Sequence, residues 1–239
     1  MQDENIKVGV FFSGFVRTYF KHHEVFNNQI FSKYDCDIKY CLWNRHEGPP
    51  DNNLRVPNQN NFGKHISDKE LRFLKDFGEV KVVDIDHYTA TKKQFKPIDR
   101  DGDVFKVDKR AMEHGEYFVN RIIDQWFLIK EGYNMFENAQ IYDVIIRLRF
   151  DAPTYNFPLV LNEQLNVPVD VGGWKFTDHM AYGQPEIMEV YCNLYAEIEN
   201  LYREYNIDVS HAVNLPLFYL QNKNIIIRTD DKIKYLIDK

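Results

Sequence analysis

The sequence predicts an α/β fold, in which one domain spanning residues 1–239 has a mostly parallel central sheet flanked by helices, with long loops at one edge. Short apolar runs typical of buried strands alternate with longer segments whose apolar residues recur at helical spacing. At about 150 residues per domain, 239 residues allow one large or two small domains. No linker separates two cores, which favours a single domain.

The first half of the chain opens as an α/β unit does. The apolar run Lys7–Phe12 predicts a buried strand, Ser13-Gly14 a turn, and the ring-rich stretch Phe15–Phe31 a helix. A second strand is expected over Asp37–Trp43, and the Asn- and Pro-rich stretch Asn44–Gly63, which has no periodicity, is expected to be a loop.

The same alternation continues to the end of the chain. A second polar stretch without clear periodicity, Thr89–Lys109, is expected to form another long loop. The further predicted elements are a helix over Ser67–Phe77 capped by Ser67 or Asp68, a strand over Val80–Asp84, a helix over Ala111–Asn138, a strand over Tyr142–Phe150, a helix over Glu186–Tyr205 and a short strand over Ile225–Ile227.

Composition limits the partners. There are 30 Lys and Arg against 36 Asp and Glu, and the net charge of −6 argues against a nucleic acid polymer, which needs a basic surface. No apolar run approaches the roughly 20 residues of a membrane span, and the polar start does not resemble a signal peptide, so we expect no membrane span and a cytoplasmic location. Three cysteines are too few and too ill-spaced for a disulfide framework or a zinc site.

Common catalytic motifs are absent. The chain has no GxGxxG, GxxxxGK[ST], GxSxG or HExxH sequence, so the simple dinucleotide, P-loop, serine hydrolase and zincin classes are not indicated. Aromatic residues make up 15% of the chain. Most must build the core, and the remainder could stack on bases or sugar rings.

The most informative polar cluster follows the strand predicted over Tyr142–Phe150. Alternation places Arg147, Arg149 and Asp151 on one face, at the carboxyl end, where open α/β sheets bind ligands. Guanidinium groups suit phosphate oxygens, and a carboxylate suits a divalent ion or a sugar hydroxyl. The alternative is a structural salt bridge, Arg149–Asp151 or Arg147–Asp143, that only ends the strand.

Two further polar clusters lie at or next to glycine-containing segments. Ser13 and Gly14 could present backbone amides to an anion, with Arg17 adding a positive charge, or they could form only a turn. Asp178 and His179 lie in an otherwise apolar run after a pair of glycines. They could form a site, or the run could be a capped turn with a buried structural histidine.

In order along the chain, these clusters resemble bacterial and large-virus glycosyltransferases of polysaccharide and lipopolysaccharide synthesis. The resemblance rests on the SGxxR-T pattern at Ser13–Thr18, the strand Asp37–Trp43, the pair Gln125-Trp126, the YDxxIRxRxD pattern at Tyr142–Asp151, and the Asp178–Gly183 run with Met188. It covers most of the chain. It implies a GT-A-like fold, a nucleotide-sugar donor and a glycan acceptor.

The resemblance also implies roles. Arg17, Arg147 and Arg149 would stabilise the donor diphosphate with Ser13 and Gly14, and Asp84 would contact the nucleoside. Asp151 and Asp178 would be catalytic, Asp178 by activating the acceptor or binding a sugar hydroxyl. The residues expected beside the acceptor are Trp43, Trp174 and His179.

The metal is a point of departure from the resemblance. GT-A enzymes commonly hold Mn²⁺ or Mg²⁺ with a D-x-D pair, but Arg149 stands in place of the first Asp. Asp151 alone could hold the divalent metal, or the arginines could neutralise the diphosphate without one. Two other functions stay open: a non-catalytic nucleotide-sugar or glycan-binding module, and a phosphate-ester hydrolase with Asp151 as nucleophile.

Overall fold

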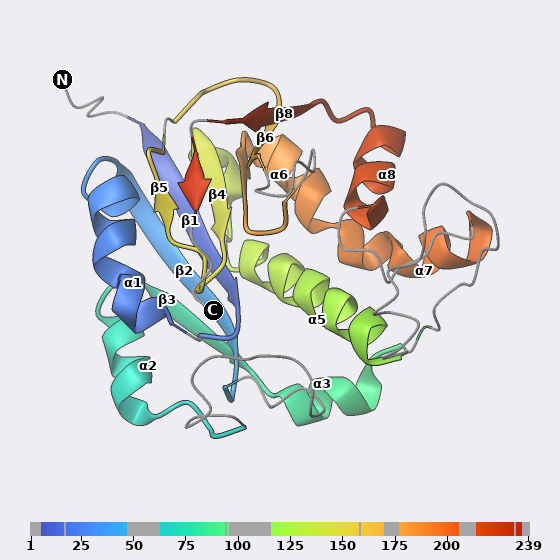
Figure 1. The fold of residues 1–239 in the computed structure, drawn as a ribbon, viewed down its shortest axis with the longest axis horizontal. Helices are drawn as coiled ribbons and strands as arrows, with labels where there is room; N and C mark the ends of the chain where they lie inside the picture. The colour runs from blue at the N-terminus through green and yellow to red at the C-terminus, as the bar shows by residue number, and fades with distance from the viewer. Residues whose placement is uncertain are drawn as a thin grey trace.

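The computed structural model describes residues 6–16, 18–46, 63–93, 95, 116–157, 159–169, 177–205, 214–231 and 233–235. Over these residues the chain forms a seven-stranded sheet in the order β3-β2-β1-β4-β7-β6-β8, with helices on both faces (Figure 1). Its strands are β1 (Lys7–Gly14), β2 (Asp35–Trp43), β3 (Glu79–Val83), β4 (Val144–Leu148), β6 (Leu165–Pro168), β7 (Met180–Gly183) and β8 (Ile227–Asp230). A small separate sheet pairs β5 (Thr154–Tyr155) with β9 (Lys234–Tyr235).

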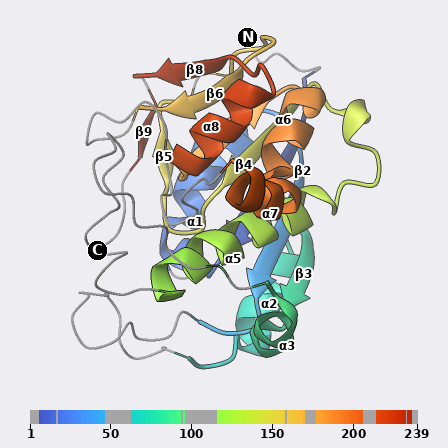
Figure 2. The ribbon, with the colours of Figure 1, turned by 90° about the vertical axis from the view of Figure 1, so that its right-hand side faces the viewer.

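The helices lie in two layers. On one face are α1 (Tyr19–Phe26), which continues into the π-helical turn η1 (Asn27–Phe31), and α2 (Asp68–Lys75); we call this the α1 face. The opposite face, the α5 face, is covered by α5 (Glu116–Tyr133), α6 (Pro185–Cys192), α7 (Leu194–Glu204) and α8 (Asn214–Asn222). Figure 2, turned by 90°, shows α5, α6, α7 and α8 in front of the sheet. Two short helices complete the set, α3 (Ile85–Thr91) and η3 (Ala139–Ile141).

The predicted α/β class with a mostly parallel sheet is confirmed. β1 pairs in parallel with β2 and with β4, and β2 pairs in parallel with β3. The exception is β7, which runs antiparallel to both β4 and β6. From β1 the chain first adds β2 and β3 on one side of the sheet, and it then crosses to the other side of β1, where it adds β4. The direction in which strands are added therefore changes between β1 and β4. Such a switch point leaves a crevice outside the carboxyl ends of the two strands.

Side-chain alternation divides the core between the two faces. On β4, Ile146 and Leu148 point to the α1 face and Ile145 to the α5 face. On the α1 face, Phe12 stacks on Tyr40 at 5.3 Å and packs edge-on against Phe26 at 5.0 Å. Much of the aromatic excess therefore forms the interior, where such pairs add about 0.5–1.5 kcal/mol beyond burial.

Several predicted elements appear with small changes of boundary. β1, β2, β3 and α5 lie where the apolar patterns placed them, and β4 is shorter than predicted, ending at Leu148. Helix α2 begins with a capping box, in which Ser67 Oγ accepts from the Glu70 amide and Glu70 Oε2 accepts from the Ser67 amide at 2.8 Å. β8 begins at Ile227, the last residue of the strand predicted over Ile225–Ile227.

Other expectations need correction. The helix predicted over Glu186–Tyr205 is two helices, because the chain turns at Asn193, whose φ and ψ of −78° and −1° end α6. No element was predicted at β6, β7, α3 or α8. The loop expected over Thr89–Lys109 overlaps the last residues of α3, and most of it lies outside the described residues. Most of the loop expected over Asn44–Gly63 lies outside the described residues.

Among the helices that the structure describes, none is both long enough and apolar enough to cross a membrane.

Candidate functional site

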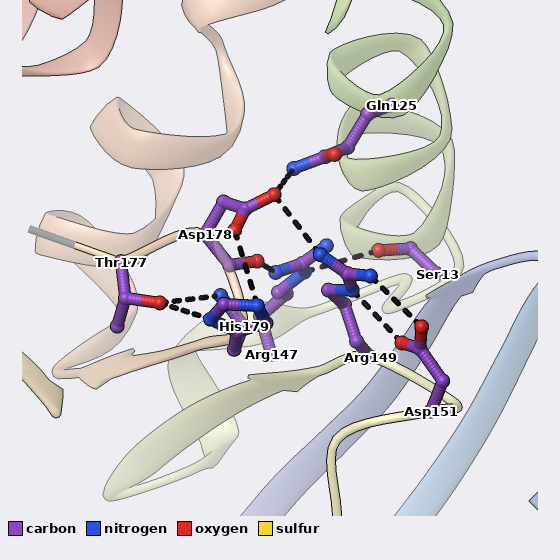
Figure 3. A network of polar contacts seen from close by, with 8 residues as sticks. All are labelled: Ser13, Gln125, Arg147, Arg149, Asp151, Thr177, Asp178 and His179. Carbon is purple, nitrogen blue, oxygen red and sulfur yellow. Dashed lines mark hydrogen bonds and ion pairs between the residues drawn. The ribbon is translucent and has the colours of Figure 1, made fainter. Parts of the chain in front are cut away.

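A cluster of charged side chains lies at the carboxyl end of β4, beside the switch point (Figure 3). Arg149 and Asp151 follow β4 directly, and Asp178 and His179 directly precede β7. Because β7 is antiparallel to β4, its first residues lie against the last residues of β4. Met180 pairs with Leu148, and the Arg149 amide donates to the His179 carbonyl at 3.1 Å. Pairing of the two strands thus brings together two of the three clusters expected from the sequence.

Arg149 joins the two carboxylates of this site. Its Nε and Nη2 each donate to one oxygen of Asp151 at 2.9 Å, and its Nη1 donates to Asp178 Oδ2 at 3.2 Å. The forked pairing matches the planar guanidinium to both carboxylate oxygens. The side chain of Asp151 is 6% exposed, whereas that of Arg149 is 18% exposed. The Arg149–Asp151 salt bridge anticipated as the structural alternative therefore forms, but it is linked to a second carboxylate.

Asp178 is held as an anion by its surroundings. Burial acts to raise the pKa of Asp178, but the positive charge of Arg149, with that of Arg147 adding to it, outweighs burial and holds the pKa well below its ordinary value. Gln125 on α5 also donates from Nε2 to Asp178 Oδ2 at 2.9 Å. The hydrogen bonds from Gln125 and Arg149 go to the same oxygen, and Oδ1 faces His179 Nε2 at 3.7 Å.

His179 is a neutral imidazole at neutral pH. Burial lowers the pKa of His179 to about 4, although Asp178 acts in the opposite direction. Its Nδ1 lies within hydrogen-bonding distance of Thr177 Oγ1, and its backbone amide donates to the same oxygen at 3.3 Å. The alternative of a buried, satisfied histidine in a turn describes much of this geometry, although its Nε2 faces the Asp178 carboxylate.

Arg147 lies beneath the site and is fully buried. Its Nε donates to Ser13 Oγ at 3.1 Å, and its Nη1 donates to the Asp178 backbone carbonyl. The third nitrogen, Nη2, has no hydrogen-bond partner among the described residues. Alternation correctly places Arg147 on the side of the sheet from which Arg149 reaches the cluster. The two arginines differ in exposure, because Arg147 is fully buried whereas the side chain of Arg149 is partly exposed.

The turn after β1 is built differently from the expectation. Ser13 is 3% exposed, and its hydroxyl accepts from Arg147, so it orients that arginine. Gly14 has a φ of +132°, a conformation that only glycine adopts readily. Arg17, the third member of this predicted anion site, lies outside the described residues.

The remaining predicted site residues are dispersed. Trp43 is 2% exposed, stacked on Phe127 at 5.9 Å and packed against Tyr88, and this burial speaks against the expected contact of its ring with a sugar. Asp84 is exposed and caps α3, where its Oδ1 accepts from two backbone amides. Since β2 lies between β3 and β1, Asp84 is about 10 Å along the edge from the end of β1. Trp174 lies outside the described residues.

The described residues do not fit a divalent metal as they are arranged. Both oxygens of Asp151 accept from Arg149, and the described part of the chain contains no group of three or more His, Cys, Asp or Glu side chains that could hold an ion. Mn²⁺ or Mg²⁺ on Asp151 stays a prediction from the sequence.

Two members of the cluster carried no assigned role in the sequence analysis. Gln125 stood only as part of a motif, and Thr177 was not singled out. The helical repeat of α5 places Ile122 and Ile129 against the sheet, three before and four after Gln125, and this spacing could have pointed Gln125 towards the strand ends.

Comparison with protein-family models and with curated proteins finds no match for this chain.

Proposed function

We propose that this chain is a glycosyltransferase with a GT-A-like fold that moves a sugar from a nucleoside-diphosphate sugar to a hydroxyl group of a glycan acceptor. The observation that carries the proposal is Arg149, a partly exposed guanidinium at the switch point that bridges Asp151 and Asp178 from separate segments. Loss of a diphosphate leaving group requires positive charge at a fixed place, and a guanidinium held by a carboxylate fork supplies it.

The charge balance of the cluster supports a site that changes on binding. The positive charges of Arg147 and Arg149 equal the negative charges of Asp151 and Asp178, while His179 is neutral. A diphosphate would compete with the Asp178 carboxylate for Arg149, because that contact is a single hydrogen bond of 3.2 Å, whereas Asp151 is bound through two of 2.9 Å. The donor would thus displace Asp178 from Arg149 before it displaced Asp151.

Asp178 is the group best placed to meet the acceptor. Its side chain is 19% exposed and ionised, so it can accept a hydrogen bond from a sugar hydroxyl. The same lowered pKa makes it a weak base, since a general base works best with a pKa near the working pH. We therefore assign Asp178 to orienting the acceptor hydroxyl, with His179 beside it.

A second candidate is a non-catalytic module that binds nucleotide sugars or glycans. The engagement of both Asp151 oxygens by Arg149 favours it, because that carboxylate is not presented to a metal or to a substrate. The same engagement argues against a phosphate-ester hydrolase that uses Asp151 as its nucleophile.

The test is release of nucleoside diphosphate from a panel of nucleotide sugars, with and without Mn²⁺, in the presence of oligosaccharide acceptors. Arg149→Lys keeps the charge but loses the fork, and we expect it to lower release by about 100-fold. The matched control is Arg203→Lys on the exposed surface of α7, which should behave as wild type.

Full turnover in Arg149→Lys would refute the assignment of the site. A thermal shift of the wild type with nucleotide sugars but no release would support the binding module and contradict the transferase.

A further inference from the structure

Burial of the charged Arg147 side chain is unfavourable for folding. A buried charge needs pairing, yet the partners of Arg147 are two neutral oxygens, the Ser13 hydroxyl and the Asp178 backbone carbonyl. Burial accordingly lowers its pKa, while Tyr191 and Asp178 act in the opposite direction. Removing a charge from water costs several kcal/mol, and an apolar side chain of similar volume would not carry that cost. Stability alone therefore does not account for an arginine here.

The two hydrogen bonds of Arg147 connect side-chain and backbone groups from three neighbouring elements of the sheet. Ser13 is near the end of β1, Arg147 lies within β4, and Asp178 directly precedes β7. The guanidinium thus holds the backbone of the Asp178 turn from below, while Arg149 and Gln125 hold the carboxylate of the same residue. Backbone and side chain of Asp178 are fixed by different residues.

We infer that Arg147 is a positioning residue that sets the place of Asp178 relative to the end of β1 and does not itself contact the donor. The inference rests on the proposed function and corrects the expectation that Arg147 and Arg149 share the diphosphate. Arg149 is the arginine with solvent exposure, whereas Arg147 is covered on the α5 face, where Tyr191 of α6 is also fully buried. A displacement of about 1 Å in a reacting group can cost about 100-fold in rate, so positioning alone can be decisive.

Three variants separate positioning from phosphate binding. Arg147→Met keeps an unbranched side chain and removes the charge. Arg147→Lys keeps the charge but cannot reach both acceptors as a fork, and Ser13→Ala removes one acceptor with little change of volume. For each we would measure kcat, KM for the donor, the Kd for the nucleoside diphosphate alone, and the midpoint of urea unfolding. Arg203→Lys again serves as the control.

Positioning predicts that Arg147→Met lowers kcat by about 100-fold while the Kd for the nucleoside diphosphate changes less than about threefold. Its unfolding midpoint should stay equal to or rise above that of the wild type. Arg147→Lys and Ser13→Ala should lower kcat in the same way. Combining Ser13→Ala with Arg147→Met should lower kcat no further than Arg147→Met alone, because Arg147→Met already removes the hydrogen bond that Ser13→Ala removes.

A Kd weakened tenfold or more in Arg147→Met, with the unfolding midpoint retained, would overturn the inference and return Arg147 to the diphosphate. An additive loss in the double variant would overturn the role of Ser13.

The proposal also has a readout that does not need turnover. Amide hydrogen exchange at Asp178 and His179 should accelerate in Arg147→Met and in Ser13→Ala, but not in Arg149→Lys, because the Arg149 side chain contacts the Asp178 carboxylate and not the backbone of this turn. Unchanged exchange at these amides would refute the positioning role even if the chain proves not to be a transferase. Absence of turnover in the wild type together with accelerated exchange would refute the proposed function alone.

Discussion

Removing the imidazole of His179 should remove a specific part of the acid sensitivity of folding. Burial lowers the pKa of His179 from 6.5 to about 4, so the folded chain binds this proton less tightly than the unfolded chain does. Between these two values the unfolded state takes up a proton that the folded state does not. The contribution of His179 to stability is therefore complete above pH 6.5 and is lost progressively as the pH falls towards 4.

The magnitude follows from the two pKa values. Between about pH 7.5 and about pH 5, a histidine with these values destabilises the folded state by about 2 kcal/mol, which approaches about 3 kcal/mol near pH 4. The charges around the ring belong to Asp178, Asp151, Arg149 and Arg147, and they are common to wild type and variant.

The assay is urea unfolding of wild type and His179→Gln at a series of pH values from about 7.5 to about 5. Over this range the wild type should lose about 2 kcal/mol more of its unfolding free energy than the variant does. His65→Gln, at an exposed histidine, controls for the loss of an imidazole as such. Equal losses in wild type and His179→Gln would refute the claim that His179 is buried as a neutral ring.

Two further predictions concern the backbone. Gly14→Ala should destabilise the fold by about 1–3 kcal/mol through strain alone, since its φ is +132° and no atom would lie within 4 Å of the new Cβ; an unchanged urea midpoint would contradict this. Ser67→Ala should cost about 1 kcal/mol by opening the capping box of α2, measured by thermal unfolding, with Ser32→Ala, which lies outside that motif, as the comparison.

The elements that could be predicted are those whose signal is local. β1 is a continuous apolar run, and α2 begins with a capping box that can be recognised from the four residues Ser67–Glu70. By contrast, β7 has only four residues, and β6 includes a buried Asn166 and ends at Pro168, so neither shows a strand pattern. Their place in the sheet is decided by pairing with distant strands, which a single sequence does not display.

At the site, too, local features could be predicted from the sequence, whereas features that depend on distant segments could not. Alternation along β4 correctly grouped Arg147 with Arg149, and the cluster of charged side chains lies at the carboxyl end of this central strand. Which of the two is buried depends on the cover supplied by α6, which begins 38 positions after Arg147 in the chain. For the same reason Trp43 was expected beside the acceptor, whereas Phe127 and Tyr88 cover its ring.

The hydrogen bond between Ser13 and Arg147 spans 134 positions of the chain, and the parallel pairing of β1 with β4 has a similar span. Contacts this distant in sequence slow folding, because the chain loses loop entropy before they form. The site therefore exists only once the two ends of this span have met, and a ligand bound there reports completed folding. At 100-fold above its Kd such a ligand would add about 2.7 kcal/mol to stability, and that stabilisation would depend on the pairing of β1 with β4.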